Sequence, residues 1–338
     1  MRRVSYILAA LAVAALFVVW IQTQVLPTLS DATRTVVAAA NADRTQSYTA
    51  DVRTKTMYRG KWVTVESKVY HSPKVERIEY SGGHLAGAIV VNQGNKSYTR
   101  RHGSSSVAVT ELATPAPSAD RIGLLLKNYS ATPGGRARVA GRDVNIVDLT
   151  PRTCAGPSKR LWIDTQTYVT LRTDDKDMEG RLISSSEFRR VTYGSPMSAD
   201  MPRIPSGKQI ETASVSAGRD AASLSRRLGF RVTLPKYVSR GYTLEGYRLH
   251  ACPCRCGHES AHIVYTNGVD TISVFETRKL HHCGVTKACD PHPGAAGQCL
   301  MNKTERGAVA VAQRGAKTVV VVGSVDPSEL MRIAESTD

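Results

Sequence analysis

Three strand-length runs follow one another in residues 158–194, and this stretch constrains the fold more than any other. Apolar side chains alternate with polar ones along it, and they are Leu161, Ile163, Val169, Leu171, Leu182 and Phe188. A period of two gives each strand one apolar and one polar face. The short turns at residues 165–167 and 174–180 predict antiparallel pairing of neighbours. The stretch therefore predicts a meander, either in an ordinary antiparallel sheet or in a curved sheet with one face open to an apolar ligand.

Six more strand-like runs precede the meander, at residues 48–58, 61–70, 74–80, 86–92, 96–101 and 106–112. Residues that permit sharp reversal, such as Arg59-Gly60, separate the runs. The clearest inward-facing side chains are Val63, Val65, Val69 and Ile78. We therefore expect a long antiparallel sheet that starts near Tyr48 and closes with the meander.

Residues 119–128 predict a helix that is apolar nearly all round, with Leu124 and Leu125 near its centre. Such a helix is ordinarily buried, but beside a concave sheet it would serve as a lid. Residues 27–42 predict another helix, which Ser30 or Asp31 can cap. Residues 132–135 predict a flexible loop, and residues 136–139 and 143–150 return to strand.

Residues 199–208 contain Pro202 and Pro205 and predict a linker, so we place one domain at 27–203 and a second at 204–338. In the second domain we expect helices at 216–228 and from Asp326 onward, and strands at 231–234 and 242–250. Two hairpins should turn at Asn267-Gly268 and at Arg314-Gly315. The fold class is thus α+β and mostly antiparallel β.

The N-terminal segment, residues 1–26, has the pattern of a signal peptide or a signal anchor. An uninterrupted apolar run at residues 6–21 follows Arg2 and Arg3. Basic residues before such a run stay in the cytoplasm. We therefore expect the rest of the chain to lie outside the cytoplasm, tethered to the cell membrane by an uncleaved anchor; a cleaved signal is the alternative.

Six of the seven cysteines lie in a histidine-rich insertion at residues 250–300. The residues expected to form a metal site or disulfides are Cys252, Cys254, Cys256, His258, His262, Cys283, Cys289 and Cys299. Exported cysteines are usually oxidised, which favours disulfides across the Asn267-Gly268 hairpin. Thiolates and imidazoles at short spacing also suit zinc or copper. Either arrangement would staple a small subdomain.

The formal net charge of +16 is spread along the chain in small basic groups. Because no basic run is interleaved with aromatic residues, nucleic acid is not an expected partner. A positive surface suits an acidic partner or an anionic lipid head group. The sequence contains no glycine-rich phosphate loop, no nucleophile elbow and no metalloprotease motif. We therefore expect a protein that is not an enzyme.

These runs resemble the RseB/MucB proteins, periplasmic regulators of envelope-stress sigma factors. The segments that carry the likeness in the first domain are Leu161-Trp162-Ile163-Asp164, Leu171-Arg172, Gly180-Arg181-Leu182 and Phe188-Arg189-Arg190-Val191. Those in the second domain are Gly229-Phe230, Leu234-Pro235, His262-Ile263-Val264-Tyr265 and Ile272-Ser273-Val274-Phe275. The Cys/His insertion and the uncleaved anchor are departures from that family's pattern.

The resemblance implies a half-barrel similar to the lipoprotein carriers LolA and LolB, with helices over its concave face, followed by a smaller α+β domain. It also implies a regulator that binds the outer segment of a membrane-spanning anti-sigma factor and is released by a lipid or lipoprotein acyl chain. The expected lining residues are Val63, Val65, Ile89, Val91, Leu124, Leu125, Leu161, Ile163 and Leu171. The alternatives are a lipid or lipoprotein carrier and a metal- or redox-sensing protein that uses residues 252–299.

Overall fold

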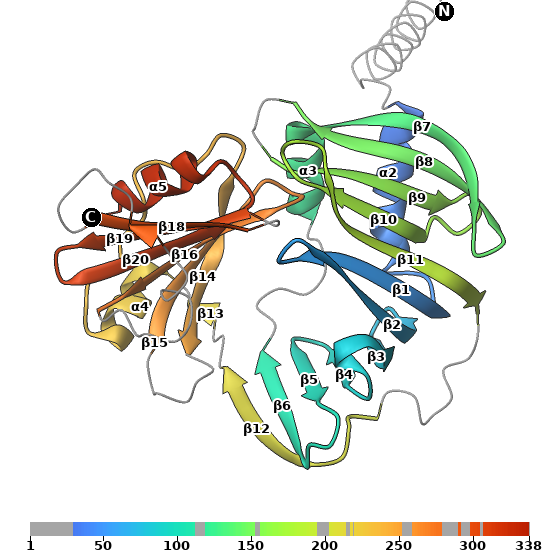
Figure 1. Ribbon diagram of the computed structural model, residues 1–338, viewed down its shortest axis with the longest axis horizontal. Coiled ribbons are helices and arrows are strands. Elements are labelled where there is room, and N and C mark those ends of the chain that lie inside the picture. Colours follow the sequence, from blue (N-terminus) through green and yellow to red (C-terminus); the bar gives the residue numbers. More distant parts are fainter. Residues whose placement is uncertain are drawn as a thin grey trace, which may run out of the picture.

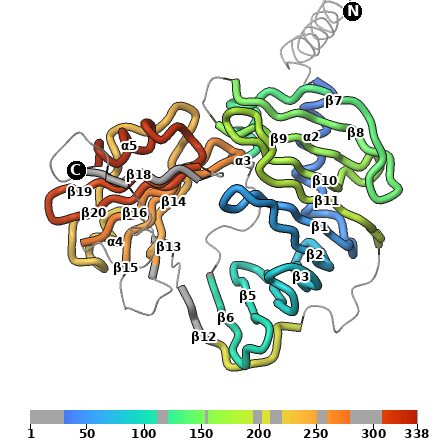
Figure 2. Tube along the Cα trace, viewed as in Figure 1, coloured from blue at the N-terminus to red at the C-terminus, as the bar shows by residue number. Residues whose placement is uncertain are grey.

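The computed structural model describes residues 30–111, 119–152, 156–194, 203–213, 217–218, 220–251, 259–278, 290–291, 298–304 and 307–337. In this part of the chain, two mostly antiparallel sheets of twelve and eight strands lie side by side (Figures 1 and 2). Few helices accompany them. The expected α+β class, with a large open sheet followed by a smaller one, is confirmed.

The first sheet consists of β1 (Tyr48–Tyr58), β2 (Lys61–Ser72), β3 (Val75–Gly82), β4 (Ile89–Gln93), β5 (Lys96–Arg100), β6 (Ser106–Glu111), β7 (Tyr129–Val139), β8 (Arg142–Pro151), β9 (Ser158–Asp164), β10 (Thr170–Lys176), β11 (Leu182–Tyr193) and β12 (Lys208–Ala213). Its strand order is β12-β6-β5-β4-β3-β2-β1-β11-β10-β9-β8-β7. The predicted meander is confirmed as β9, β10 and β11, and β11 pairs with β1.

The β1–β2 hairpin shows how local sequence fixes this sheet. Arg59 and Gly60 form the two-residue loop and have φ values of 49° and 72°. Two successive positive φ angles match the right-handed twist of the flanking strands, and glycine adopts such an angle without strain. The loop sets the register in which Thr54 pairs with Val65.

Two details of the first sheet differ from the sequence prediction. The predicted loop at residues 132–135 is wrong, because β7 runs through it and a register shift between Pro133 and Gly135 accommodates the extra residue. The strand β12 begins at Lys208, the last residue of the predicted linker, and pairs in parallel with β6. The domain boundary at 203/204 stays a prediction.

Two helices accompany the first sheet. In α2 (Asp31–Ala42), the backbone N–H of Thr33 donates a hydrogen bond to the Ser30 hydroxyl, at 3.2 Å, which confirms the predicted cap. Its buried residues Ala32, Val36 and Ala39 pack against β7, β8 and β9 (Figure 1). The predicted helix at 119–128 is confirmed as α3 (Ala119–Asn128), which contacts β7 and α2.

The second sheet contains β13 (Ala217–Gly218), β14 (Thr243–Ala251), β15 (Glu259–Thr266), β16 (Thr271–Thr277), β17 (Asp290–Pro291), β18 (Gln298–Thr304), β19 (Gly307–Arg314) and β20 (Lys317–Gly323). Both predicted hairpins are confirmed as β15–β16 and β19–β20. The terminal helix α5 (Pro327–Glu335) begins at the Asp326 cap and buries Leu330 and Ile333 against the sheet.

The second helix of this unit, α4 (Ala221–Leu228), is shorter than predicted. Asp220 caps it with a reciprocal hydrogen bond to Ser223, so the helix starts five residues after position 216. The strand predicted at 231–234 is wrong. The backbone N–H groups that a strand would use for pairing donate to side chains of other segments instead. The N–H of Val232 donates to Ser225 Oγ at 2.8 Å, and that of Thr233 donates to Glu276 Oε1 at 3.0 Å.

Residues 1–29, 252–258 and 279–289 lie outside the described ranges, and so do the predicted anchor and most of the predicted Cys/His cluster. Within the described ranges, no helix combines the length and the apolarity needed to span a bilayer.

Candidate ligand groove

A groove of about 940 Å³ lies on the inner face of the first sheet, over β1, β2, β3 and β11. Its apolar wall consists of Val52, Val63, Val65, Val69, Ile78, Leu85 and Phe188. Both Tyr48 and Tyr58 line it, so at about 3.4 Å per residue it extends roughly 34 Å along β1. An elongated apolar chain fits this shape better than a compact polar molecule.

Strand register explains why these residues share a face. Val52 pairs with Ser67 and with Phe188, while Thr54 pairs with Val65. Directly paired residues point to the same side of a sheet, and every second residue of a strand does so too. The period-two alternation of β1 and β2 therefore produces one continuous apolar surface, and it places all four residues expected to face inward in the groove.

The expected lining residues fall into three places. Val63 and Val65 line the groove. Ile89 and Val91 pair with Glu79 and Arg77, the two neighbours of the groove residue Ile78 on β3. Because neighbouring residues of a strand point to opposite faces, Ile89 and Val91 lie on the face away from the groove.

The other expected residues lie on the inner side but belong to the packing around α2 and α3. Ile163 and Leu171 are fully buried. Leu161 and Leu125 pack against the core that α2 covers, and Leu124 is absent from the groove wall. Because α2 fills the inner face over β7–β9, the groove is restricted to the other half of the sheet.

A cluster of polar side chains closes the groove at the end of β1 nearest α2. The Tyr48 and His71 rings stack with centroids 4.8 Å apart, and His71 Nε2 lies 2.9 Å from the backbone oxygen of Asp43. Glu76, which lines the groove, accepts a hydrogen bond from Asn92 Nδ2 at 3.0 Å. The Glu76 carboxylate lies 3.7 Å from His71 Nδ1.

The two ionisable groups of this cluster shift each other's pKa. His71 lowers the pKa of the Glu76 carboxyl, and burial opposes this without reversing it. Burial lowers the pKa of the His71 imidazole, but Glu76 and the Asp43 carbonyl outweigh burial and leave that pKa raised. The pair thus favours an ionised Glu76 beside a protonated His71.

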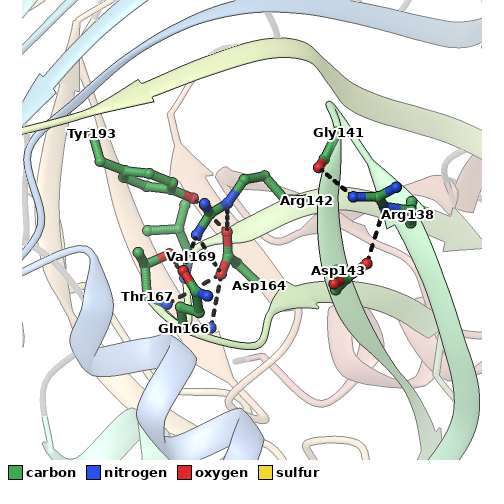
Figure 3. Close-up of polar contacts among 9 residues, drawn as sticks. All are labelled: Arg138, Gly141, Arg142, Asp143, Asp164, Gln166, Thr167, Val169 and Tyr193. Carbon is green, nitrogen blue, oxygen red and sulfur yellow. Dashed lines mark hydrogen bonds and ion pairs between the residues drawn. The ribbon is translucent and has the colours of Figure 1, made fainter.

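A second polar cluster lies beside the Tyr48 end of the groove, where Tyr193 pairs with Tyr48 (Figure 3). Asp164 is 1% exposed and accepts hydrogen bonds from Arg142 Nε at 2.8 Å and from Tyr193 Oη at 3.2 Å. The backbone N–H groups of Gln166 and Thr167 also donate to it. Burial raises the pKa of Asp164, but these donors outweigh it and leave the pKa lowered. The carboxylate joins β8, the β9–β10 turn and β11, which is a structural role.

Comparison with known proteins identifies the architecture. The family model of the MucB/RseB N-terminal domain matches residues 34–207, more than half of the chain. The chain belongs to the MucB/RseB family. Strands β1 to β11 and the groove fall within the matched residues, and β12 follows directly after them.

Individual members of the family are distant in sequence. The "Sigma-E factor regulatory protein RseB" of Escherichia coli K12 and that of Shigella flexneri are each 22% identical over 202 residues, 60% of this chain and 57% of theirs. The match thus spans little more than half the length of those relatives.

Solved structures show the fold over nearly the whole chain. The Pseudomonas aeruginosa MucA/MucB complex aligns over 90% of this chain and 97% of that one, with TM-score 0.65 and 19% identity. A structure of MucB in complex with MucA(peri) aligns with TM-score 0.64 and 20% identity over 91% of this chain. The RseB relatives are regulatory proteins by name, and the MucB relatives bind MucA.

Of the eight residues expected to form a metal site or disulfides, the structure describes the side chain of His262. Its ring stacks on Phe275 at 4.2 Å, and its Nε2 lies 2.9 Å from Ser273 Oγ. Burial, with smaller contributions from Arg248 and His250, lowers the pKa of His262 to about 3. No group of three metal-ligating side chains occurs among the residues that the structure describes.

Proposed function

We propose that this chain is a non-enzymatic regulator that acts outside the cytoplasm. It binds the outer segment of a membrane-spanning anti-sigma factor, and an acyl chain in the groove over β1–β3 controls that binding. Family membership supports the first part, because two solved relatives are MucB bound to MucA. The groove supports the second part.

The observation that carries ligand sensing is the open apolar wall of the groove. Val63 and Val65 of β2 point to a surface that α2 leaves uncovered, whereas Val52 of β1 is buried and Val69 packs against the core that includes Ala42. Burying an acyl chain contributes about 0.8 kcal/mol per methylene, so one chain can bias a two-state docking equilibrium. An apolar groove of this length without an occupant would otherwise expose that surface to water.

Photocrosslinking in cells tests the ligand. Cells that express the full chain are fed a fatty acid bearing a diazirine, irradiated, and the crosslinked peptides are mapped. We expect crosslinks on β1, β2 and β3 that Val65→Glu abolishes. Thr64→Glu is the matched control, because Thr64 is exposed on the opposite face of β2. Equal labelling of both variants, or labelling confined to other segments, refutes the acyl-binding proposal.

A pulldown tests the partner. The full chain should retain the extracytoplasmic segment of an anti-sigma factor from its own cell, and added lipid should release it. If the anti-sigma factor is captured but lipid does not release it, the partner proposal stands and the proposal of control by an acyl chain is wrong.

We further propose that residues 1–26 tether the protein to the cell membrane, with domains at 27–203 and 204–338. The apolar run at residues 6–21 supports the tether. Alkaline extraction of membranes distinguishes the alternatives: an anchored chain stays in the pellet with its N-terminal Met1 segment intact, whereas a cleaved chain is released.

A further inference from the structure

The groove end nearest α2 is negative in a protein whose net charge is +16. Two carboxyl groups gather there, that of Glu76 on the groove wall and that of Asp43 beside His71. Burial raises the pKa of the Asp43 carboxyl, and His71 opposes this by favouring its ionised form. His71 is the cation described among them. The local excess of negative charge therefore opposes the charge of the molecule as a whole.

The end of helix α2 adds to this negative potential. Helix α2 ends at Ala42, and the Asp43 carbonyl faces His71 at 2.9 Å. A helix C-terminus carries about half an elementary negative charge, and α2 has no basic residue in its last turn to offset it. Low-dielectric walls such as those of this groove strengthen such a potential.

Glu76 is the acidic group that a groove ligand can reach. Asn92 occupies its Oε2, at 3.0 Å. Its Oε1 forms an ion pair with His71 Nδ1 at 3.7 Å, and a carboxylate oxygen can accept more than one hydrogen bond. The Oε1 atom thus retains acceptor capacity toward the groove, next to the apolar residues Val69 and Ile78.

We propose that Glu76 forms a subsite for an ammonium or hydrogen-bond-donating group of the ligand. The occupant of the groove is then an amine-bearing amphiphile, whose apolar chain lies along β1 and β2 and whose cationic group sits at the α2 end. This inference rests on the proposed acyl-binding function and specifies its ligand class. An anionic group of the same amphiphile lies away from this end of the groove, because Glu76 and Asp43 repel it.

Competition for crosslinking tests the subsite on the full chain in spheroplasts. A photoactivatable decanol derivative labels the groove, and decylammonium, decanoate and decanol compete for it. Glu76→Gln should raise the half-competing concentration of decylammonium about tenfold, as expected for the loss of one partly buried ion pair, and leave decanol unchanged. Comparing each competitor between variants cancels its partitioning into the membrane.

Glu79→Gln is the matched control. Glu79 lies on the same strand, faces the opposite side of the sheet and pairs with Arg77 at 2.7 Å. Its removal should change none of the three competitors. Glu76→Lys provides a second test and should make decanoate the stronger competitor. Retained labelling by the decanol probe shows that each variant keeps its groove.

The outcomes separate the two proposals. If no probe labels the groove, both the acyl-binding function and the subsite are wrong. If the decanol probe labels the groove but decylammonium competes equally well in the unsubstituted chain and in Glu76→Gln, the acyl-binding function stands and the subsite is wrong.

Discussion

Asn267 on the second sheet donates a hydrogen bond from Nδ2 to the Tyr129 hydroxyl on the first sheet, at 3.2 Å. Asn128 completes the contact, because its Nδ2 donates to the backbone oxygens of Asn267 at 2.9 Å and Gly241 at 2.8 Å. Asn267 is fully buried. The tip of the β15–β16 hairpin is therefore part of the first unit's core, and the two sheets are joined by specific contacts.

Gly268→Ala should disrupt this contact. Gly268 has φ +95°, and an added Cβ would lie 2.3 Å from the backbone nitrogen of Leu125. We expect the hairpin to be displaced from α3. Calorimetry should then show two thermal transitions for Gly268→Ala and one for the unsubstituted chain, because the contact joins the two sheets. Gly315→Ala is the control, since it has φ +56° with nothing near its Cβ and so carries only the backbone strain. Equal melting curves for the two variants would show that the contact does not couple the sheets.

Asp164→Asn should be strongly destabilising. The change removes the charge that holds Arg142 and weakens the hydrogen bonds from Tyr193 and the turn (Figure 3). We expect the free energy of unfolding to fall by about 2–4 kcal/mol. Asp143→Asn removes the neighbouring pair with Arg138, whose side chains are both more than 70% exposed, and should cost less than about 0.5 kcal/mol. Denaturant titration measures both, and similar losses would contradict the structural role of Asp164.

His71 and His262 should affect stability with opposite dependence on pH. The folded-state pKa of His262 is lowered to about 3, below its unfolded value, so only the unfolded state gains a proton as the pH falls. Its contribution is present above pH about 6.5 and decreases by up to about 2 kcal/mol between pH 6.5 and 5. The folded-state pKa of His71 is raised, so its contribution is complete below the unfolded value and is lost as the pH rises.

The measurement is the free energy of unfolding of His71→Asn and His262→Asn at pH 5 and pH 8. Relative to the unsubstituted chain, His71→Asn should cost more at pH 5 and His262→Asn more at pH 8. A pH-independent cost for either variant would contradict the corresponding pKa shift.

The cysteines of residues 250–300 should either form disulfides or bind a metal ion in the native protein. Elemental analysis and a free-thiol count on the chain from its own compartment distinguish the two arrangements. Disulfides predict at most one free thiol, at Cys154, and no metal, whereas a metal site predicts bound zinc or copper that chelation releases together with free thiols. Seven free thiols without metal would contradict both.

Much of the first sheet follows from local sequence. Alternation along β1 and β2 specifies which side chains share a face, and turn residues such as Gly60 specify where the strands reverse. The three strands of the meander and the helix α3 follow from the same kind of pattern. Two predicted elements were wrong because they depend on pairing with other segments. Residues 132–135 pair with β8 as part of β7, and the backbone N–H of Thr233 donates to the distant Glu276.

The sequence by itself determined the family, the antiparallel sheets and the inward residues Val63, Val65, Val69 and Ile78. Tertiary structure alone decided where the groove lies. Ile163 and Leu171 alternate just as the groove valines do, but α2 packs on that half of the sheet and removes them from any ligand. The meander therefore supplies the core beneath α2, with Phe188 alone of its six alternating apolar residues on the groove wall. Periodicity records which face a residue occupies, whereas only packing decides whether that face meets a helix or a ligand.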